Sequence, residues 1–355
     1  MRVIRRWAPY VALSLILAVA AGYGWYRMSD TGKGWRYEDS LKSFCEGLIP
    51  YEESAGLTGK NGSALSRDYR ASGSEGDYDS CTVASLDITI GRIPDSARDT
   101  GSPEVFDRLD EMSADLPPIP LGGGWRGYTD VVTTATVLTC DNKDGAVVVT
   151  AGDDSVDDNS VDDPYDADDM ERAHGVAELV AATAVRAAEN WGCEAKAGGR
   201  IPRLPVPAGW GSPVDAAGTC AGLPLRDQDW VEYVMDAPAS GTAPLERCVL
   251  GEINEGGQPL LRLEAAFGPY AQRLRSDAPD SDTFKNGAGG SEGSYWATAR
   301  CPGDGPRAVF QIYPSSDVHI DTKADEIAGK AFVAFAEGRV RQHGCTDLTL
   351  PSSLS

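Results

Sequence analysis

The sequence predicts an α+β fold: an N-terminal transmembrane helix, then two duplicated domains, each an antiparallel sheet with helices packed on it in the order α-β-β-β-β-α. Three observations predict this organisation. The chain of 355 residues has an uncharged apolar run at residues 7–26, it contains eight cysteines, and the features around the first four recur in the same order around the last four. Such internal recurrence is typical of repeated structural units.

The N-terminal run has the length of a membrane span. Its 20 residues, at about 1.5 Å each, match a hydrocarbon core of roughly 30 Å. An arginine cluster precedes the run and Arg27 follows it, which predicts a cytoplasmic N-terminus and an extracytoplasmic body. The alternative is a secreted protein, because Ala-Val-Ala at residues 18–20 resembles a signal-peptide cleavage site. Residues 1–27 are predicted as cytoplasmic tip and anchor, and residues 28–42 as a juxtamembrane stalk.

The two halves share an order of features after this anchor. Each begins with a cysteine, Gly-Leu and a proline, continues through a strand-like run with the second cysteine, and reaches the third cysteine after a Gly-rich stretch. Strand-like runs then flank Asp-Gly at residues 144–145 and 304–305, a strong hairpin signal. The predicted extracytoplasmic four-cysteine domains span residues 43–195 and 218–350, joined by a Pro/Gly linker at residues 196–217.

A long Ala-rich helix is predicted to close each domain, over residues 167–191 and 322–342. Steps of four back from the residue five before the final cysteine select apolar residues in both helices, which predicts one buried stripe in each. Gly192 and Gly344 follow the helices and suit the left-handed position that ends a helix. The predicted stripes consist of Val176, Val180, Ala184 and Ala188, and of Ala328, Phe332, Ala336 and Val340.

The eight cysteines predict four structural disulfides. None forms a Cys-x-x-Cys pair, which argues against clustered zinc or thioredoxin-like chemistry, and an even number outside the membrane suits an oxidising compartment. Four cysteines allow three connectivities in each half. Because domain termini usually lie close together, the first and fourth cysteines are predicted to pair. The predicted bridges are Cys45–Cys193, Cys81–Cys140, Cys220–Cys345 and Cys248–Cys301.

Two motifs suggest a functional site, one for calcium binding and one for hydrolysis. Residues 152–169 hold nine aspartates, and carboxylates are calcium ligands, but no EF-hand pattern occurs. A solvated loop in which Asp168 and Asp169 favour the start of a helix is the preferred interpretation. Gly-x-Ser-x-Gly around Ser291 matches the hydrolase elbow, but it precedes a strand, which favours a loop. We predict no cofactor, no metal site and no catalytic residue.

Other polar residues have structural interpretations as well. His174, His319 and His343 have no identifiable nucleophile beside them, and packing or surface positions are expected. The acidic residues Glu46, Glu52 and Glu53 lie where a short helix is predicted to begin, and the helix dipole alone favours acids there.

The formal net charge of −22 disfavours nucleic acid and anionic lipid headgroups as partners. A cationic partner or simple solubility fits this charge better. The predicted membrane contact is the single N-terminal helix, and a protein or cell-wall partner is possible.

The openings of the two halves, CEGLIPYEESAGL and CAGLPLRDQDW, resemble the Cys-x-Leu-Leu-x-Pro-x-Glu start of many uncharacterised exported proteins and lipoproteins of actinobacteria. The composition and the Arg-rich anchor resemble Streptomyces-type envelope proteins. A lipid-attachment cysteine near the start is missing, and the resemblance implies no activity.

A repeated scaffold without a recognisable set of catalytic residues favours a non-catalytic binding or cell-envelope protein. A groove between the two halves is one expected binding site. The alternative is an extracytoplasmic hydrolase whose site cannot be recognised from the sequence.

Overall fold

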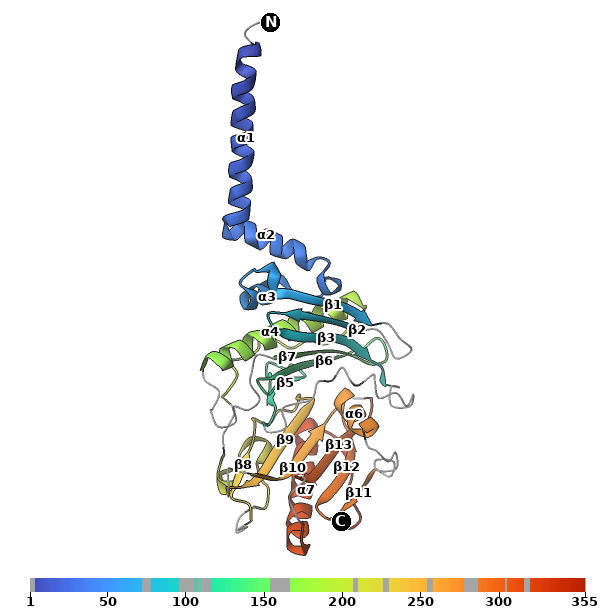
Figure 1. Cartoon of the computed structure of the whole chain (residues 1–355). Helices are drawn as coiled ribbons and strands as arrows, with labels where there is room; N and C mark the ends of the chain where they lie inside the picture. The colour runs from blue at the N-terminus through green and yellow to red at the C-terminus, as the bar shows by residue number, and fades with distance from the viewer. Residues whose placement is uncertain are drawn as a thin grey trace.

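The computed structural model describes most of the chain. The described residues are 4–71, 78–95, 106, 109, 116–153, 167–206, 210–225, 230–253, 258–277, 287–303, 305–315 and 320–354. Helix α1 (Ile4–Met28) extends away from two sheet-containing domains, and the chain then turns into α2 (Asp30–Leu41) at the top of the first domain (Figure 1).

The turn between α1 and α2 is held by local hydrogen bonds. The Ser29 hydroxyl accepts a bond from the amide of Gly32 at the start of α2. The Arg36 guanidinium donates to the carbonyls of Tyr26 and Arg27 at the end of α1. Farther along α2, Tyr37 and Leu41 are buried in the first core, so the segment predicted as a stalk packs on the first domain.

The apolar N-terminus forms a helix, as expected from its sequence. Over the described residues, however, no helix has both the length and the apolar character needed to cross a membrane. The structure therefore does not support the predicted transmembrane helix.

The first domain contains a seven-stranded antiparallel sheet in the order β1-β2-β3-β7-β6-β5-β4. The short helix α3 (Tyr51–Thr58) precedes it and the long helix α4 (Ala167–Asn190) follows it. Its strands are β1 (Leu65–Ala71), β2 (Tyr78–Val83), β3 (Leu86–Ile93), β4 (Ile119–Pro120), β5 (Gly127–Thr129), β6 (Thr133–Thr139) and β7 (Ala146–Asp153).

The second domain repeats the antiparallel sheet and the long closing helix, but not the predicted order α-β-β-β-β-α. Among its described residues no α-helix precedes the sheet, and an additional helix lies between two of its strands. Its sheet has the order β11-β12-β13-β10-β9-β8, with β14 paired to β12. Its strands are β8 (Tyr233–Met235), β9 (Leu245–Glu252), β10 (Gln258–Ala266), β11 (Ala288–Ser291), β12 (Ser294–Arg300), β13 (Ala308–Pro314) and β14 (Thr346–Thr349). Its helices are α6 (Pro269–Asp277) and α7 (Thr322–His343), and four short 3₁₀ helices complete the described elements at Phe44–Gly47, Gly62–Ala64, Pro213–Asp215 and Gly218–Cys220.

A four-stranded unit is common to both sheets. In the first, β2 and β3 form one hairpin, β6 and β7 form another, and the order is β2-β3-β7-β6. In the second, β9 and β10 pair, β12 and β13 pair, and the order is β9-β10-β13-β12. The predicted α+β class is therefore confirmed, and the additional strands extend the edges of this shared unit.

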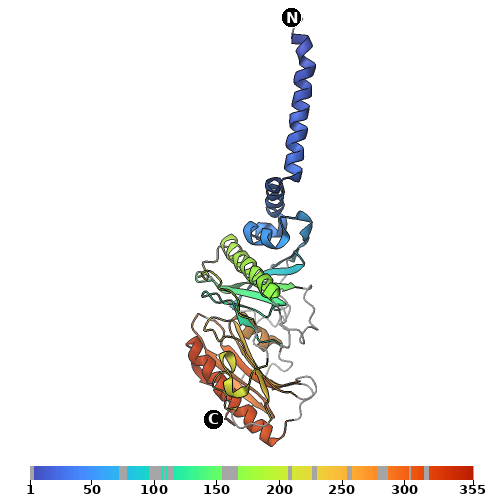
Figure 2. The same ribbon diagram turned by 90° about the vertical axis from the view of Figure 1, so that its left-hand side faces the viewer.

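The faces of the first sheet have different neighbours. Because side chains alternate along a strand, Val147 and Val149 of β7 join the core under α4, whereas Ala146 and Val148 face the second domain. There they meet α6 and the ends of β9, β10 and β13 in one apolar cluster. Figure 2 shows α4 and α7 each covering a face of their own sheet.

The predicted helix ends are confirmed. Gly192 and Gly344 have φ values of 61° and 65°, in the left-handed region that glycine adopts without a Cβ penalty. The predicted stripes are buried except at Val340, which is partly buried against the second core.

All eight cysteines form disulfides, but the predicted pairing is wrong. The bridges join sequential cysteines: Cys45–Cys81, Cys140–Cys193, Cys220–Cys248 and Cys301–Cys345. The strand order explains the error. Cys81 lies on β2 and Cys140 directly follows β6, three strand spacings away in the order β2-β3-β7-β6, or about 14 Å. A bridge needs Cα atoms within about 7 Å, and the second half has the same geometry.

Candidate functional site

One wall of a surface groove is the exposed side of α4. Its buried stripe faces the sheet, whereas Glu171, His174 and Glu178 follow each other at steps of three and four and therefore share another face of the helix. Ala182 and Val185 continue this face towards the end of α4. The groove wall thus changes from polar to apolar along the helix.

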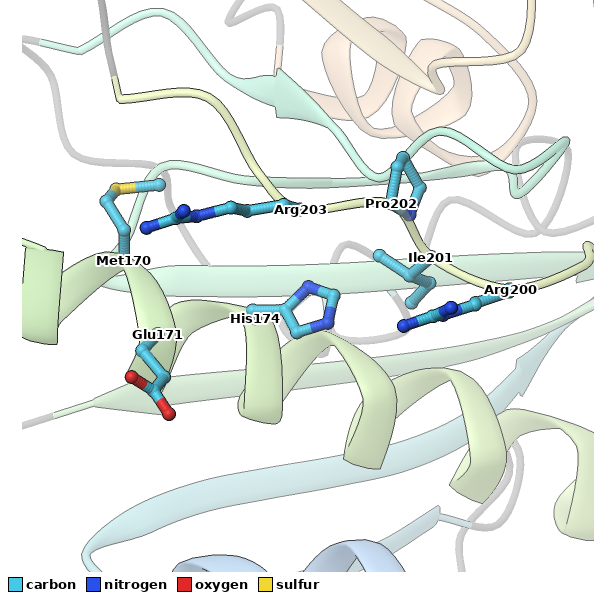
Figure 3. Close-up of a pocket in the computed structure, with 7 residues that line it drawn as sticks. All are labelled: Met170, Glu171, His174, Arg200, Ile201, Pro202 and Arg203. Atoms are coloured by element: carbon cyan, nitrogen blue, oxygen red, sulfur yellow. The ribbon is translucent and has the colours of Figure 1, made fainter.

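The opposite wall is an extended segment in which the same kind of residue recurs at every third position. Residues 200–205 read Arg-Ile-Pro-Arg-Leu-Pro. Ile201 and Leu204 are both 4% exposed and belong to the first core, whereas Arg200 and Arg203 are exposed. Three residues per turn is the repeat of a polyproline II helix, which places the two arginines on one side. Figure 3 shows both arginine side chains extending over α4 in the same direction.

The Gly-rich loop before β5 holds this segment in place. The Trp125 indole N–H donates to the carbonyl of Gly199 at 2.6 Å, and the amide of Gly199 donates to the carbonyl of Gly123 at 2.8 Å. Gly123 has a φ of +62°, and a Cβ there would lie 2.5 Å from the carbonyl oxygen of Arg200. The glycine is therefore required for the close approach of the two chain segments.

The two walls enclose two adjoining hollows. Their volumes are about 730 and 820 Å³, within the range of small-ligand sites. Arg200 and Ile201 line both, so the hollows form one groove over α4. The first is lined by Met170, Glu171, His174, Arg200, Ile201, Pro202 and Arg203. The second is lined by Pro50, Tyr51, Glu52, Glu53, Trp125, Glu178, Ala181, Ala182, Val185, Arg186, Gly199, Arg200 and Ile201.

One end of the groove is basic. Arg200 and Arg203 have no hydrogen-bond or ion-pair partner in the described part of the chain. Between them, the His174 ring points towards the extended segment (Figure 3). Its Nε2 lies 3.4 Å from a carboxylate oxygen of Glu178, and its Nδ1 is a buried atom without a partner. The two guanidinium groups are therefore available to a ligand with acceptor oxygens.

The other end has three glutamates against two arginines, one of which, Arg200, also lines the first hollow. Glu52 and Glu53 lie in the first turn of α3, as predicted, and both line the second hollow together with Glu178. Neither Glu52 nor Glu53 has a partner among the described residues. At the far end, Arg186 donates to the carbonyl of Ile49 at 3.1 Å, so this arginine already has a partner.

The remaining candidates lie elsewhere. Ser291 ends β11 in a hairpin with β12, not at a strand-to-helix elbow. His343 is buried, stacks on Phe267 with ring centroids 3.8 Å apart, and lies 3.3 Å from a carboxylate oxygen of Glu246. Asp168 and Asp169 occupy the first turn of α4. The aspartates of residues 154–166, and His319, lie outside the described residues.

The two hollows do not lie between the two halves, where a groove was expected. The contact between the domains contains the apolar cluster of β6, β7 and α6, and Gln272 of α6 donates to the carbonyls of Pro94 and Asp95. Both hollows belong to the first domain. Arg200 and Arg203 were not predicted as site residues, because they lie in the segment predicted as a linker. The repeat of Arg, an apolar residue and Pro at residues 200–205 is the sequence pattern that could have indicated them.

In the described ranges, no group of three or more His, Cys, Asp or Glu side chains could hold a metal ion. No protein-family model, curated protein or solved structure matches the chain. The groove combines a concave surface with charged groups that lack partners in the folded protein.

Proposed function

We propose that the protein is a non-catalytic binding protein of the extracytoplasmic side of the cell, and that it holds its ligand in the groove over α4. The observation that carries the proposal is the set of unpartnered charged groups on both walls. Four disulfides are typical of an oxidising, extracytoplasmic environment. A partner at this groove is therefore expected outside the cytoplasm.

The composition of the groove favours binding over hydrolysis. Its described lining contains no serine, threonine or cysteine, the side chains that usually act as nucleophiles in acyl transfer. It does contain three arginines, and arginine side chains form bidentate hydrogen bonds to carboxylate and phosphate groups. Such groups recognise a ligand without changing it.

Photocrosslinking in intact cells tests this proposal. A photoreactive phenylalanine derivative at position 182 would lie in the groove, and the same derivative at position 337 on α7 is the control, because Glu337 is half exposed in the other domain. We expect crosslinked products from position 182 and none from position 337. Equal crosslinking at both positions, or none at position 182, would contradict the proposal.

We also propose that α1 attaches the protein to a membrane. The uncharged run at residues 7–26 supports this attachment, as do large apolar side chains on α1 that are 55–64% exposed: Leu13, Leu15, Ile16, Leu17 and Val19. Replacing both Leu15 and Leu17 by aspartate should release the protein from the membrane pellet after cell lysis. Val214→Asp, at a similarly exposed valine, should leave it in the pellet. A mature chain that lacks residues 1–20 would instead establish cleavage and secretion.

A further inference from the structure

We infer that the groove takes an extended peptide of about eight residues, with acidic side chains at one end and basic side chains at the other. The inference rests on the proposed function, because it names the ligand class of the same groove. It follows from three features: the spacing of the two arginines, the opposite charge of the two ends, and the length of the groove.

The basic end is suited to two separate anionic groups. Arg200 and Arg203 lie one turn of an extended segment apart, which is roughly 9 Å at 3.1 Å per residue. That value is the backbone spacing, and the two side chains extend in the same direction without converging (Figure 3), so their guanidinium groups are suited to separate anionic groups. Two acidic residues three positions apart in an extended peptide have the same repeat, so each carboxylate can meet one guanidinium. The His174 ring, whose side chain is 25% exposed, lies between them (Figure 3).

The acidic end makes a uniform polyanion a poor occupant. A chain of phosphates that filled the basic end would continue towards Glu52, Glu53 and Glu178, where like charges repel. The net charge of −22 adds a long-range repulsion for any highly charged anion. A peptide can carry carboxylates at one end and ammonium or guanidinium groups at the other, so its charges complement both ends.

The length of the groove sets the length of the peptide. Its lining runs along α4 from Met170 to Arg186, which is about 24 Å at 1.5 Å per residue. An extended peptide covers that distance with about eight residues at 3.1 Å each. Ala181, Ala182 and Val185 lie in the half of the groove that ends at Arg186, so the side chains that the peptide turns towards α4 in that half are expected to be small or apolar.

Fluorescence anisotropy with the full chain tests this inference. The probes are fluorescein-labelled octapeptides with glutamates at the first and fourth positions and lysines at the last two, and the same peptides in reverse order. A linear polyphosphate of similar length serves as a competing anion. The variants are Arg200→Glu, Arg203→Glu and Glu53→Lys, all at exposed or partly exposed side chains that do not stabilise the core. Lys323→Glu is the control for the two arginine variants, because it makes the same charge change on α7 of the other domain.

We expect one peptide order to bind, with affinity at least tenfold lower in each arginine variant and in Glu53→Lys, and changed less than twofold in Lys323→Glu. A peptide in which lysine replaces the glutamate farthest from the lysine pair should bind Arg203→Glu better than it binds the parent protein. The inference is overturned if no octapeptide binds. It is also overturned if polyphosphate binds in place of the peptides and binds more tightly to Glu53→Lys. In either case, crosslinking at position 182 decides separately whether the groove binds another ligand.

Discussion

Replacing Gly198 by alanine should displace the extended wall of the groove. A Cβ at this position would lie 2.4 Å from the Trp125 ring, about 1 Å closer than an ordinary van der Waals contact. Trp125 cannot easily move away, because it is 6% exposed and its indole N–H is bonded to the Gly199 carbonyl. Overpacking of this kind costs about 1–3 kcal/mol, and loss of the hydrogen bond costs about 1 kcal/mol. We expect a local destabilisation of about 2 kcal/mol.

Hydrogen exchange measured by mass spectrometry reports this local effect even if the two domains unfold separately. A loss of about 2 kcal/mol should accelerate exchange of the Gly199 amide roughly 30-fold. Gly199→Ala is the matched control, because a Cβ there would lie 3.6 Å from the Gly123 carbonyl oxygen, an ordinary contact. Equal exchange in Gly198→Ala and Gly199→Ala would refute the packing argument for the wall.

Two further predictions concern the second domain. Arg247→Met should lower the free energy of unfolding of this domain by about 3–5 kcal/mol, because it leaves Glu264 as an unpaired buried charge. The Glu264 side chain is 7% exposed and lies 3.0 Å from the Arg247 guanidinium. A urea midpoint unchanged from the parent would contradict this. Burial, together with the hydrogen bond to Asp325, raises the pKa of Tyr295 to about 12. The neutral phenol therefore stabilises the fold below pH about 10, and this contribution is lost as the pH rises towards 12. Urea unfolding across that range should show a smaller loss of stability in Tyr295→Phe than in the parent, and parallel curves would contradict it.

Local signals in the sequence were sufficient for much of the fold. Asp144-Gly145 lies between β6 and β7, with Gly145 at a φ of +96°, because a hairpin turn with positive φ selects glycine. The last helix of the first half ends two residues before Gly192, and that of the second half ends one residue before Gly344, as the combination of an apolar stripe and Gly-Cys predicted. Each of these features depends on residues near one another in the chain.

The disulfides could not be predicted in the same way, because their pairing depends on strand order. The prediction that Cys81 and Cys140 are neighbours assumed that successive strands carrying cysteines lie side by side. In the structure, β3 and β7 lie between the corresponding strands. Each bridge instead ties an adjacent segment to the sheet: Cys45 precedes α3 and reaches β2, and Cys193 follows α4 and reaches the end of β6.

The segment after the final cysteine packs differently in the two halves. In the second domain it forms β14, which pairs with β12, and Leu354 then packs on α7 so closely that a Cβ at Gly329 would lie 2.6 Å from it. In the first domain the corresponding segment buries Ile201 and Leu204 but turns Arg200 and Arg203 outwards. Each domain has its own buried core, so the segment after the last helix can differ between them without changing the shared sheet. Only the first domain presents the charged side chains of this segment along its last helix, so the specificity of the groove is expected to depend on residues 200–205 more than on the shared sheet.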